Sequence, residues 1–128
     1  MNQDHGREHG PGEPAPRLLS SNRVEGVAVY GREGDKLGTV AAFIFDRFTG
    51  QSEYIVVAIG GVLGVGANYH PLPWHLATYD PGRDGYKISV EKTTLSSGPS
   101  FKHASDAAFD RAYADRVANY YQGSGPIR

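Results

Sequence analysis

Turn-forming residues interrupt the central part of this chain at short intervals, and this spacing constrains its fold more than any other feature. Between Leu18 and Val90 the segments are rich in β-branched and aromatic residues, and turn signals recur about every 8–15 residues. Examples are residues 32–35, the tight turn expected at Thr49-Gly50, and the loop over 80–85. This pattern is typical of a small all-β sandwich or barrel.

The pattern predicts short strands, two of which carry local signals of their own. Gly26 lies in the first strand and is expected at a bulge. Pro71 and Pro73 lie two residues apart, so their missing N–H donors fall on one edge, and that strand borders the sheet or turns a corner. The predicted strands are Val24–Tyr30, Leu37–Phe48, Tyr54–Ile59, Tyr69–Leu76, Ala77–Tyr79 (which can pair separately) and Tyr86–Val90.

Two of these strands are apolar on both faces, whereas a barrel interior accounts for only one face. Residues 86–90 alternate cleanly, so one of their faces is expected in water. Residues 54–59 are apolar on both sides, and another element must cover their outer face. The same holds for residues 37–45, where Leu37, Ala41, Phe43 and Phe45 are assigned to one face and Val40, Ala42 and Ile44 to the other.

The C-terminal segment is the candidate cover. Ser105 is suited to an N-cap, Asp106 and Asp110 suit the positive end of a helix, and Gly123 is a natural stop. These signals predict a helix over residues 104–122. The helix carries an aromatic stripe at 3–4 spacing, which consists of Phe109, Tyr113, Val117, Tyr120 and Tyr121. We expect this stripe to pack either on its own barrel or on that of a partner.

Length and composition bound the remaining possibilities. The 128 residues fit one domain. A disordered tail is expected at 1–17, which carries no apolar face, and residues 123–128 form a short tail after the helix. The formal net charge of −1, with mixed signs, argues against a nucleic-acid surface. The chain has no cysteine, no secretory signal and no apolar run near the ~20 residues of a membrane span. We therefore expect a soluble, cytoplasmic protein without membrane insertion.

Three groups of residues invite a chemical interpretation, and none supports it. The glycines over 60–66 lack the Lys-Ser/Thr end and the following helix of a phosphate loop, and they predict a structural loop. His70 and His75 lie five residues apart on one strand, so their rings point to opposite faces and are poor candidates for a shared metal. No nucleophile elbow or paired base is present. We expect no catalytic residue, no metal and no cofactor.

Several segments together carry a family resemblance. They are SSNRVEG at 20–26, VYGREGDKLG at 29–38, FDRFTGQ at 45–51, and the most specific pair, GGVLGVG at 60–66 followed by YHPLPW at 69–74. In order and spacing they resemble the PRC-barrel family over residues 19–101, which implies a six-stranded small barrel domain at 18–101 followed by the helix. The resemblance also implies protein contact and assembly without shared catalytic residues. The family includes the cytoplasmic barrel of the photosynthetic reaction centre H subunit and the C-terminal barrel of a ribosome-maturation factor.

The expected function is that of a non-catalytic interaction module rather than an enzyme. We expect it to self-associate, as a homodimer, through the C-terminal helix or an open strand edge, and to dock onto an unidentified protein without direct nucleic-acid contact. The alternatives are a small-ligand-binding barrel and an accessory factor contacting a ribosomal or photosynthetic complex. Trp74 is either a core residue or a contact anchor. The candidate contact residues are Trp74, Tyr69, Phe109, Tyr113, Val117, Tyr120 and Tyr121.

Overall fold

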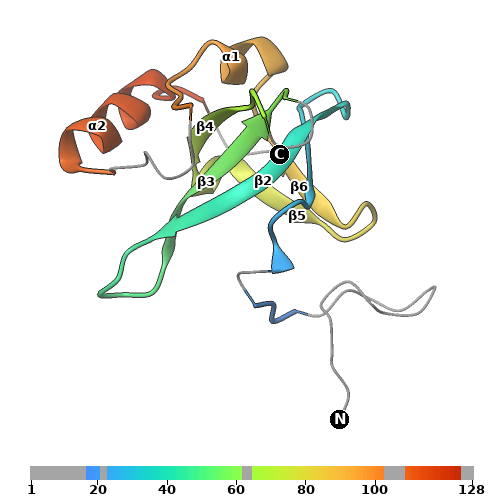
Figure 1. The fold of residues 1–128 in the computed structure, drawn as a ribbon. Helices are drawn as coiled ribbons and strands as arrows, with labels where there is room; N and C mark the ends of the chain where they lie inside the picture. Colours follow the sequence, from blue (N-terminus) through green and yellow to red (C-terminus); the bar gives the residue numbers. More distant parts are fainter. Residues whose placement is uncertain (1–16, 21–22, 62–64, 103–108, 125–128) are drawn as a thin grey trace.

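The computed structural model describes residues 17–20, 23–61, 65–102 and 109–124 (Figure 1). Strands dominate these ranges, and an α-helix lies at their C-terminal end, as the sequence predicts. The elements are β1 (Ala28–Tyr30), β2 (Lys36–Phe45), β3 (Ser52–Ile59), β4 (Asn68–Pro73), the 3-10 helix η2 (Trp74–Leu76), β5 (Ala77–Asp80), β6 (Gly85–Ile88), α1 (Lys92–Ser96) and α2 (Arg111–Tyr120). The expected all-β class with a C-terminal helix is therefore confirmed.

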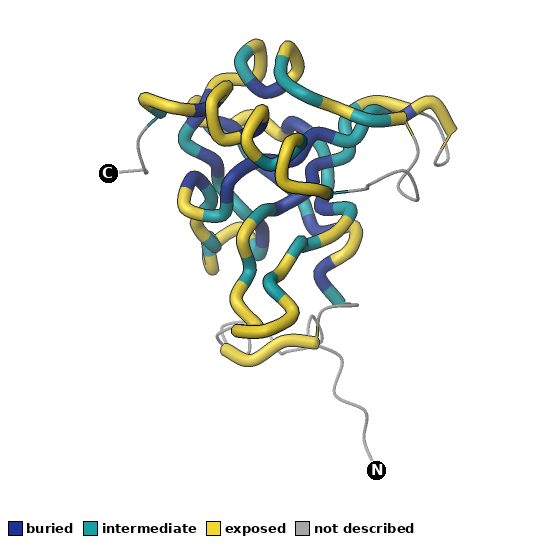
Figure 2. The backbone as a smooth tube through the Cα atoms, turned by 90° about the vertical axis from the view of Figure 1, so that its left-hand side faces the viewer, coloured by how far each residue is buried: buried dark blue, intermediate teal, exposed yellow. Residues whose placement is uncertain are grey.

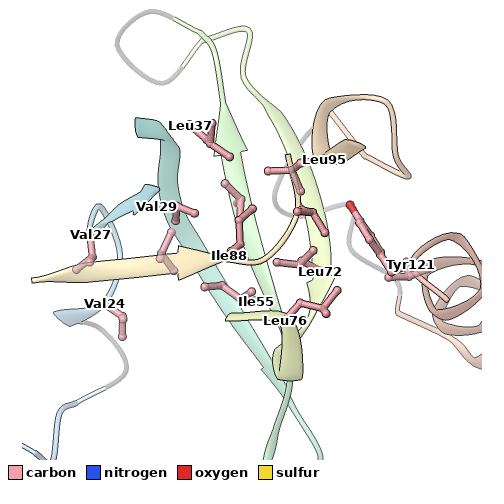
Figure 3. Packing of buried hydrophobic residues seen from close by; sticks show 14 residues of the cluster. Val24, Val27, Val29, Leu37, Ile55, Leu72, Leu76, Ile88, Leu95 and Tyr121 are labelled. Carbon is pink, nitrogen blue, oxygen red and sulfur yellow. The ribbon is translucent and has the colours of Figure 1, made fainter. Parts of the chain in front are cut away.

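The strands form one six-stranded sheet in the order β4-β3-β2-β1-β6-β5. Neighbouring strands are antiparallel except β1 and β6, which are parallel. β6 crosses β2 and β3 with the core side chains between them, so the sheet coils around a single core (Figure 3). The barrel is not closed: within the described ranges no ladder joins β4 to β5, and these strands are the two edges of the sheet. The prediction that the strand with two prolines borders the sheet is confirmed.

The first predicted strand is too long at its start. The backbone N–H of Val27 donates to the carbonyl of Val24 at 3.1 Å, and Gly26 has a φ of +85°, so these residues form a turn. β1 begins only at Ala28. Gly26 is a turn residue and also the bulge expected there, because Gly26 and Val27 together lie opposite Val40. The N–H of Gly26 donates to the Val40 carbonyl at 2.9 Å, and the N–H of Val40 donates to the Val27 carbonyl at 2.8 Å. A further register shift in this ladder falls between Val29 and Tyr30.

The hairpin between β2 and β3 also differs from its prediction. β2 ends at Phe45 and not at Phe48, because the Asp46 carboxylate accepts hydrogen bonds from the N–H groups of Phe48 at 2.7 Å and Thr49 at 3.1 Å. The N–H of Gly50, with a φ of +78°, donates to the Asp46 carbonyl at 2.7 Å. An aspartate that binds its own backbone in this way stops a strand, so the turn is longer than the expected Thr49-Gly50 pair.

The fourth strand ends before its tryptophan. Pro73 is the last residue of β4, and Trp74 begins the 3-10 helix η2 rather than continuing the strand to Leu76. β5 then starts at Ala77 and pairs with β6, as the prediction of a separate strand requires. The short helix α1 is not predicted by the sequence. The last strand, β6, covers residues 85–88 instead of 86–90.

Two bulges change which β2 side chains point into the core. The register shifts between Lys36 and Gly38 against β1, and again between Val40 and Ala42 against β3. Each extra residue reverses the alternation of the following side chains. Leu37 and Val40, which were assigned to opposite faces, are therefore both buried in the core, and Phe43 packs against it. Strict alternation was the wrong assumption for this strand.

The core draws on every layer of the molecule (Figures 2 and 3). Buried positions lie in the middle of the strands, whereas turns and the outer side of α2 are exposed. Leu95 from α1 and Val117 from α2 join the strand side chains in one cluster. The cluster consists of Val24, Val27, Val29, Leu37, Val40, Ile55, Val57, Leu72, Leu76, Ile88, Val90, Leu95, Val117 and Tyr121.

The C-terminal segment covers the outer side of β3 and β4 in its own chain. Val56 is buried although its neighbours Ile55 and Val57 belong to the core, so both faces of β3 are covered. The rings of Tyr54 and Phe109 lie 4.8 Å apart. α2 begins after Asp110, whose carboxylate accepts from the N–H of Tyr113 at 2.9 Å.

The predicted start of this helix needs correction. The helix was expected from residue 104 with Ser105 as its N-cap, but Ser105 and Asp106 lie outside the described residues, and the N-cap of α2 is Asp110. The predicted stop fits: the helix ends at Tyr120, and Gly123 follows with a φ of +94°.

Candidate interaction surface

A groove of about 730 Å³ opens beside the C-terminal part of β2, next to η2 and β6. Three aromatic side chains form its floor, Phe43 from β2, Trp74 from η2 and Tyr86 from β6. Apolar side chains from two separate segments, Leu18, Leu19 and Phe45, lie at its rim. We call these six residues with the hollow between them the aromatic groove.

The floor of the aromatic groove is a packed aromatic cluster. The ring centroids of Phe43 and Trp74 lie 4.9 Å apart with an interplanar angle of 74°. Tyr86 lies 5.8 Å from Phe43 at 90° and 6.0 Å from Trp74 at 57°. These are the edge-to-face distances of rings in direct contact. An ammonium group therefore has no room between the rings, and the cluster offers a rigid apolar floor rather than a cation cage.

Local sequence features place each floor residue. The bulge at Ala41 brings Phe43 opposite Ile55 on the core side of the sheet. Pro73 ends β4, and the following 3-10 turn carries Trp74 away from the strand. Tyr86 pairs with Tyr79 across β5 and β6, and their ring centroids lie 5.5 Å apart.

The loop before β6 supports this floor. The Tyr79 hydroxyl donates to the Asp84 carboxylate at 2.7 Å, and Asp84 holds a φ of 47°. Burial, together with the nearby Asp84 carboxylate, raises the pKa of the Tyr86 phenol. The Tyr86 side chain consequently stays uncharged at neutral pH and contributes an apolar ring to the groove.

The rim of the groove exposes unusual amounts of apolar surface. Phe45 is 61% exposed, Leu18 is 88% exposed, and Phe48 at the tip of the adjoining β2–β3 hairpin is 92% exposed. Single exposed apolar residues are common, whereas several around one hollow indicate a contact surface. Two exposed charged residues, Arg17 and Glu25, also line the groove.

Of the candidate contact residues, only Trp74 lies in the aromatic groove. Tyr69 lies on β4, where its N–H donates to the Phe101 carbonyl at 2.9 Å and its ring stacks on the Phe101 ring at 5.6 Å. Trp74 packs against the core cluster and also lines the hollow, and its role as a contact anchor stays a prediction.

The helix stripe packs on its own barrel, which is the first of the two arrangements considered for it. Val117 and Tyr121 are buried, and Phe109 and Tyr113 pack against the core cluster. Tyr120 is 40% exposed and donates its hydroxyl to the Thr94 carbonyl at 2.7 Å. None of the five is among the residues that line the aromatic groove.

The other groove residues were not singled out in the sequence. Phe43 and Phe45 were assigned to a strand face, and Phe48 was expected inside a strand. A signal was present: Asp46 stands just after Phe45, and an Asp-initiated turn leaves the following Phe48 without a strand to pack in. The neighbourhood of Leu18 and Trp74 depends on tertiary folding and has no local signal.

The groups considered for chemistry lie apart from the groove. His70 is 3% exposed in β4, and burial lowers its pKa against an opposing interaction with the Pro99 carbonyl. Within the described ranges no cluster of three His, Cys, Asp or Glu side chains could hold a metal ion. Among these same residues no helix has the length and apolar composition that a membrane crossing requires.

The glycine-rich segment fits a structural loop over its described part. Gly60, Gly61 and Gly66 all have positive φ angles, of +80°, +83° and +87°. A Cβ on Gly61 would lie 2.7 Å from the backbone nitrogen of Ala67, so a side chain has no room there. Residues 62–64 of the same segment lie outside the described residues.

Six short strands coiled around one core, with a helix packed on the outside, define a small all-β domain of the barrel type. The chain belongs to the PRC-barrel family, since the family model described as PRC-barrel domain matches residues 16–95. The resemblance found in the sequence is thereby confirmed. A search of the curated proteins finds no match.

Proposed function

We propose that this chain is a non-catalytic protein-contact module that acts through the aromatic groove. The observation that carries the proposal is the hollow of about 730 Å³ with a rigid aromatic floor and an exposed apolar rim. Aromatic side chains in a preformed hollow are the usual anchors of protein interfaces, because they bury much area at little cost in side-chain entropy. Protein contact is also the general behaviour of PRC-barrel domains.

Charge supports a protein partner over a nucleic acid. The chain carries 13 basic and 14 acidic residues, and the described lining of the groove contains one residue of each sign, Arg17 and Glu25. A phosphate backbone needs a cluster of cations for binding through counterion release. A balanced rim around an apolar floor instead resembles the polar rim and apolar centre of a protein interface.

Site-specific photo-crosslinking in the source cells tests this proposal. A benzophenone amino acid at Phe45 places the reactive group at the rim, and the same group at exposed Lys92 on α1, at the opposite end of the molecule in Figure 1, is the matched control. We expect discrete protein adducts from position 45 and far weaker ones from position 92. Equal adduct yields at the two positions would contradict the proposal.

Binding of a small apolar ligand is the second candidate, favoured by the volume of the groove. Ligand pockets span roughly 300–1,000 Å³, and the groove falls in this range. Trp74 is the only tryptophan of the chain, so its fluorescence reports occupancy of the groove directly. Titration with 8-anilinonaphthalene-1-sulfonate should quench Trp74 emission and raise the melting temperature. A probe that changes neither quantity removes this candidate.

A further inference from the structure

We propose that the aromatic groove receives the tip of the β2–β3 hairpin of a second copy of this chain, with Phe48 seated against Trp74. The exchange is reciprocal, so that two hairpins and two grooves form one two-fold dimer. This inference rests on the proposed function, because it names the partner of the same groove. It places the dimer contact at the hairpin and not at the C-terminal helix.

The hairpin tip is built to present Phe48. Its ring is 92% exposed, and the tip extends beyond the body of the molecule (Figure 1). Three hydrogen bonds fix the turn beneath it: the Asp46 carboxylate accepts from Phe48 and Thr49 at 2.7 and 3.1 Å, and Gly50 donates to the Asp46 carbonyl at 2.7 Å. A turn held in this way loses little entropy on binding. Phe48 is therefore a preorganised apolar knob.

The aromatic groove is a suitable receptor for such a knob. Its floor of Phe43, Trp74 and Tyr86 already packs edge to face, and a fourth ring can extend this pattern at centroid distances of about 4.5–7 Å. Phe45 and Gly50, on either side of the tip, line the groove of their own chain, whereas Phe48 does not.

Knob and hollow lie on one surface, and this favours a second copy over an unrelated chain. A two-fold contact requires that the same patch be complementary to itself. Here the base of the hairpin forms one wall of the groove, so a two-fold axis beside the hairpin brings each tip over the opposite groove. The contact then closes at two copies instead of propagating into a filament.

Charge is complementary in the same sense. Exposed Arg47 stands beside Phe48 at the tip, and exposed Glu25 lines the groove that would receive it. This pair occurs twice in a two-fold dimer, so opposite charges meet at both places.

The C-terminal helix offers no comparable contact. Val117 and Tyr121 are buried in their own chain, and Tyr120 is bonded to the Thr94 carbonyl. On the β4 edge, Tyr69 pairs with Phe101, and Pro71 and Pro73 have no N–H to donate. The apolar surface that remains open at the groove is thus the better dimer interface.

Sedimentation velocity of the full chain over a wide concentration range tests the inference. We expect a concentration-dependent dimer, and at least a ten-fold weaker association for Phe48→Ser. Val65→Ser is the matched control, because Val65 is also a strongly exposed apolar residue, 74% exposed, but does not line the groove. Trp74 emission should shift to the blue on dimerisation in the wild type and in Val65→Ser only.

A pair of charge reversals distinguishes loss of the contact from loss of folding, because an unfolded variant would not regain dimerisation when a second charge is reversed. Arg47→Glu should weaken the dimer, and Glu25→Arg in the same chain should restore it. A wild type that stays monomeric at all concentrations, or a Phe48→Ser variant that dimerises like the wild type, would overturn the inference. If the wild type is monomeric and the crosslinker at position 45 still captures another protein, this inference fails while the proposed function stands.

Discussion

Two regions of the molecule carry similar aromatic side chains and treat them in opposite ways; we call them the covered end and the open end. At the covered end, beside β4 and the C-terminal segment, Tyr121 is 2% exposed. At the open end, around the aromatic groove and the hairpin tip, Phe48 is 92% exposed. Both ends are rich in apolar surface. Among the described residues a helix packs over the covered end, whereas residues 17–19 only line the groove at the open end. The difference indicates that the apolar surface of a small barrel is covered either by a segment of the same chain or by another molecule.

The covered end is closed by several kinds of contact. Phe101 pairs with Tyr69 through two backbone hydrogen bonds of 2.9 and 3.0 Å, which occupies part of the free edge of β4. Phe109 packs on Tyr54, and Val117 enters the core. The free edge of β4 is thus partly paired and also carries two prolines, which lack N–H donors. Both features protect an edge strand from pairing with another sheet.

The family match draws a boundary between the two ends. It covers residues 16–95, which include all the residues that line the aromatic groove. Phe101 and α2 lie beyond residue 95. The groove is thus part of the shared domain, whereas most of the cover at the other end is formed by residues that follow it. The proposed protein contact is therefore assigned to the shared domain, and the C-terminal segment to its cover.

The largest predicted effect is at the covered end. Val117→Asp places a carboxylate at a fully buried position of α2, so the free energy of unfolding should fall by about 3–5 kcal/mol. Ala118→Asp adds the same charge to the next, exposed position and should change it by less than about 0.5 kcal/mol. Urea denaturation measures both. Equal stabilities of the two variants would mean that α2 does not pack on the barrel in solution.

The second prediction concerns pH at the covered end. Burial lowers the pKa of His70, so the unfolded chain takes up its proton first as the pH falls. The contribution of neutral His70 is fully present above about pH 6.5 and is lost as the pH falls towards the lowered pKa, at up to about 1.4 kcal/mol per pH unit. His70→Leu should flatten this slope in urea titrations between pH 7.5 and 5. A variant at exposed His75, His75→Gln, should retain it.

A smaller effect is predicted at the helix cap. Asp110→Ala removes the carboxylate that accepts from the Tyr113 N–H, and should lower the free energy of unfolding by about 1 kcal/mol. Asp115→Ala, on the exposed side of the same helix, serves as the control and should have less than half this effect. If Asp110→Ala is silent in chemical denaturation, the cover is not anchored at this point.

The sequence predicts the family, the strand order along the chain and the edge strand, because these depend on local signals. Pro71 and Pro73 restrict β4 to the border of the sheet or to a corner, and the border is the position that it occupies. The confirmed separation of β5 follows from its neighbouring turns. The exact strand ends were wrong wherever a side chain or a special φ intervened, as at Asp46 and Gly26.

The candidate site was harder to predict, because burial depends on partners far away in the sequence. The two β2 bulges shift side chains between faces, and strict alternation gives no hint of them. An aromatic stripe predicts a contact face but not whose surface it meets, so Tyr121 looked like a contact residue and Phe48 like a strand residue. Where the C-terminal segment packs determines which of these side chains is buried, and it packs over the covered end.

The smallest predicted change in stability is at the open end. Phe48→Ser removes a ring that is 92% exposed, so at concentrations where the chain is monomeric the free energy of unfolding should change by less than about 0.5 kcal/mol. Tyr121→Ser, at the covered end, should cost several times more, because it leaves a cavity in the core. Urea denaturation of dilute samples compares the two. A loss above about 1 kcal/mol for Phe48→Ser would mean that the hairpin tip packs on its own chain, and the open end would then be closed like the other.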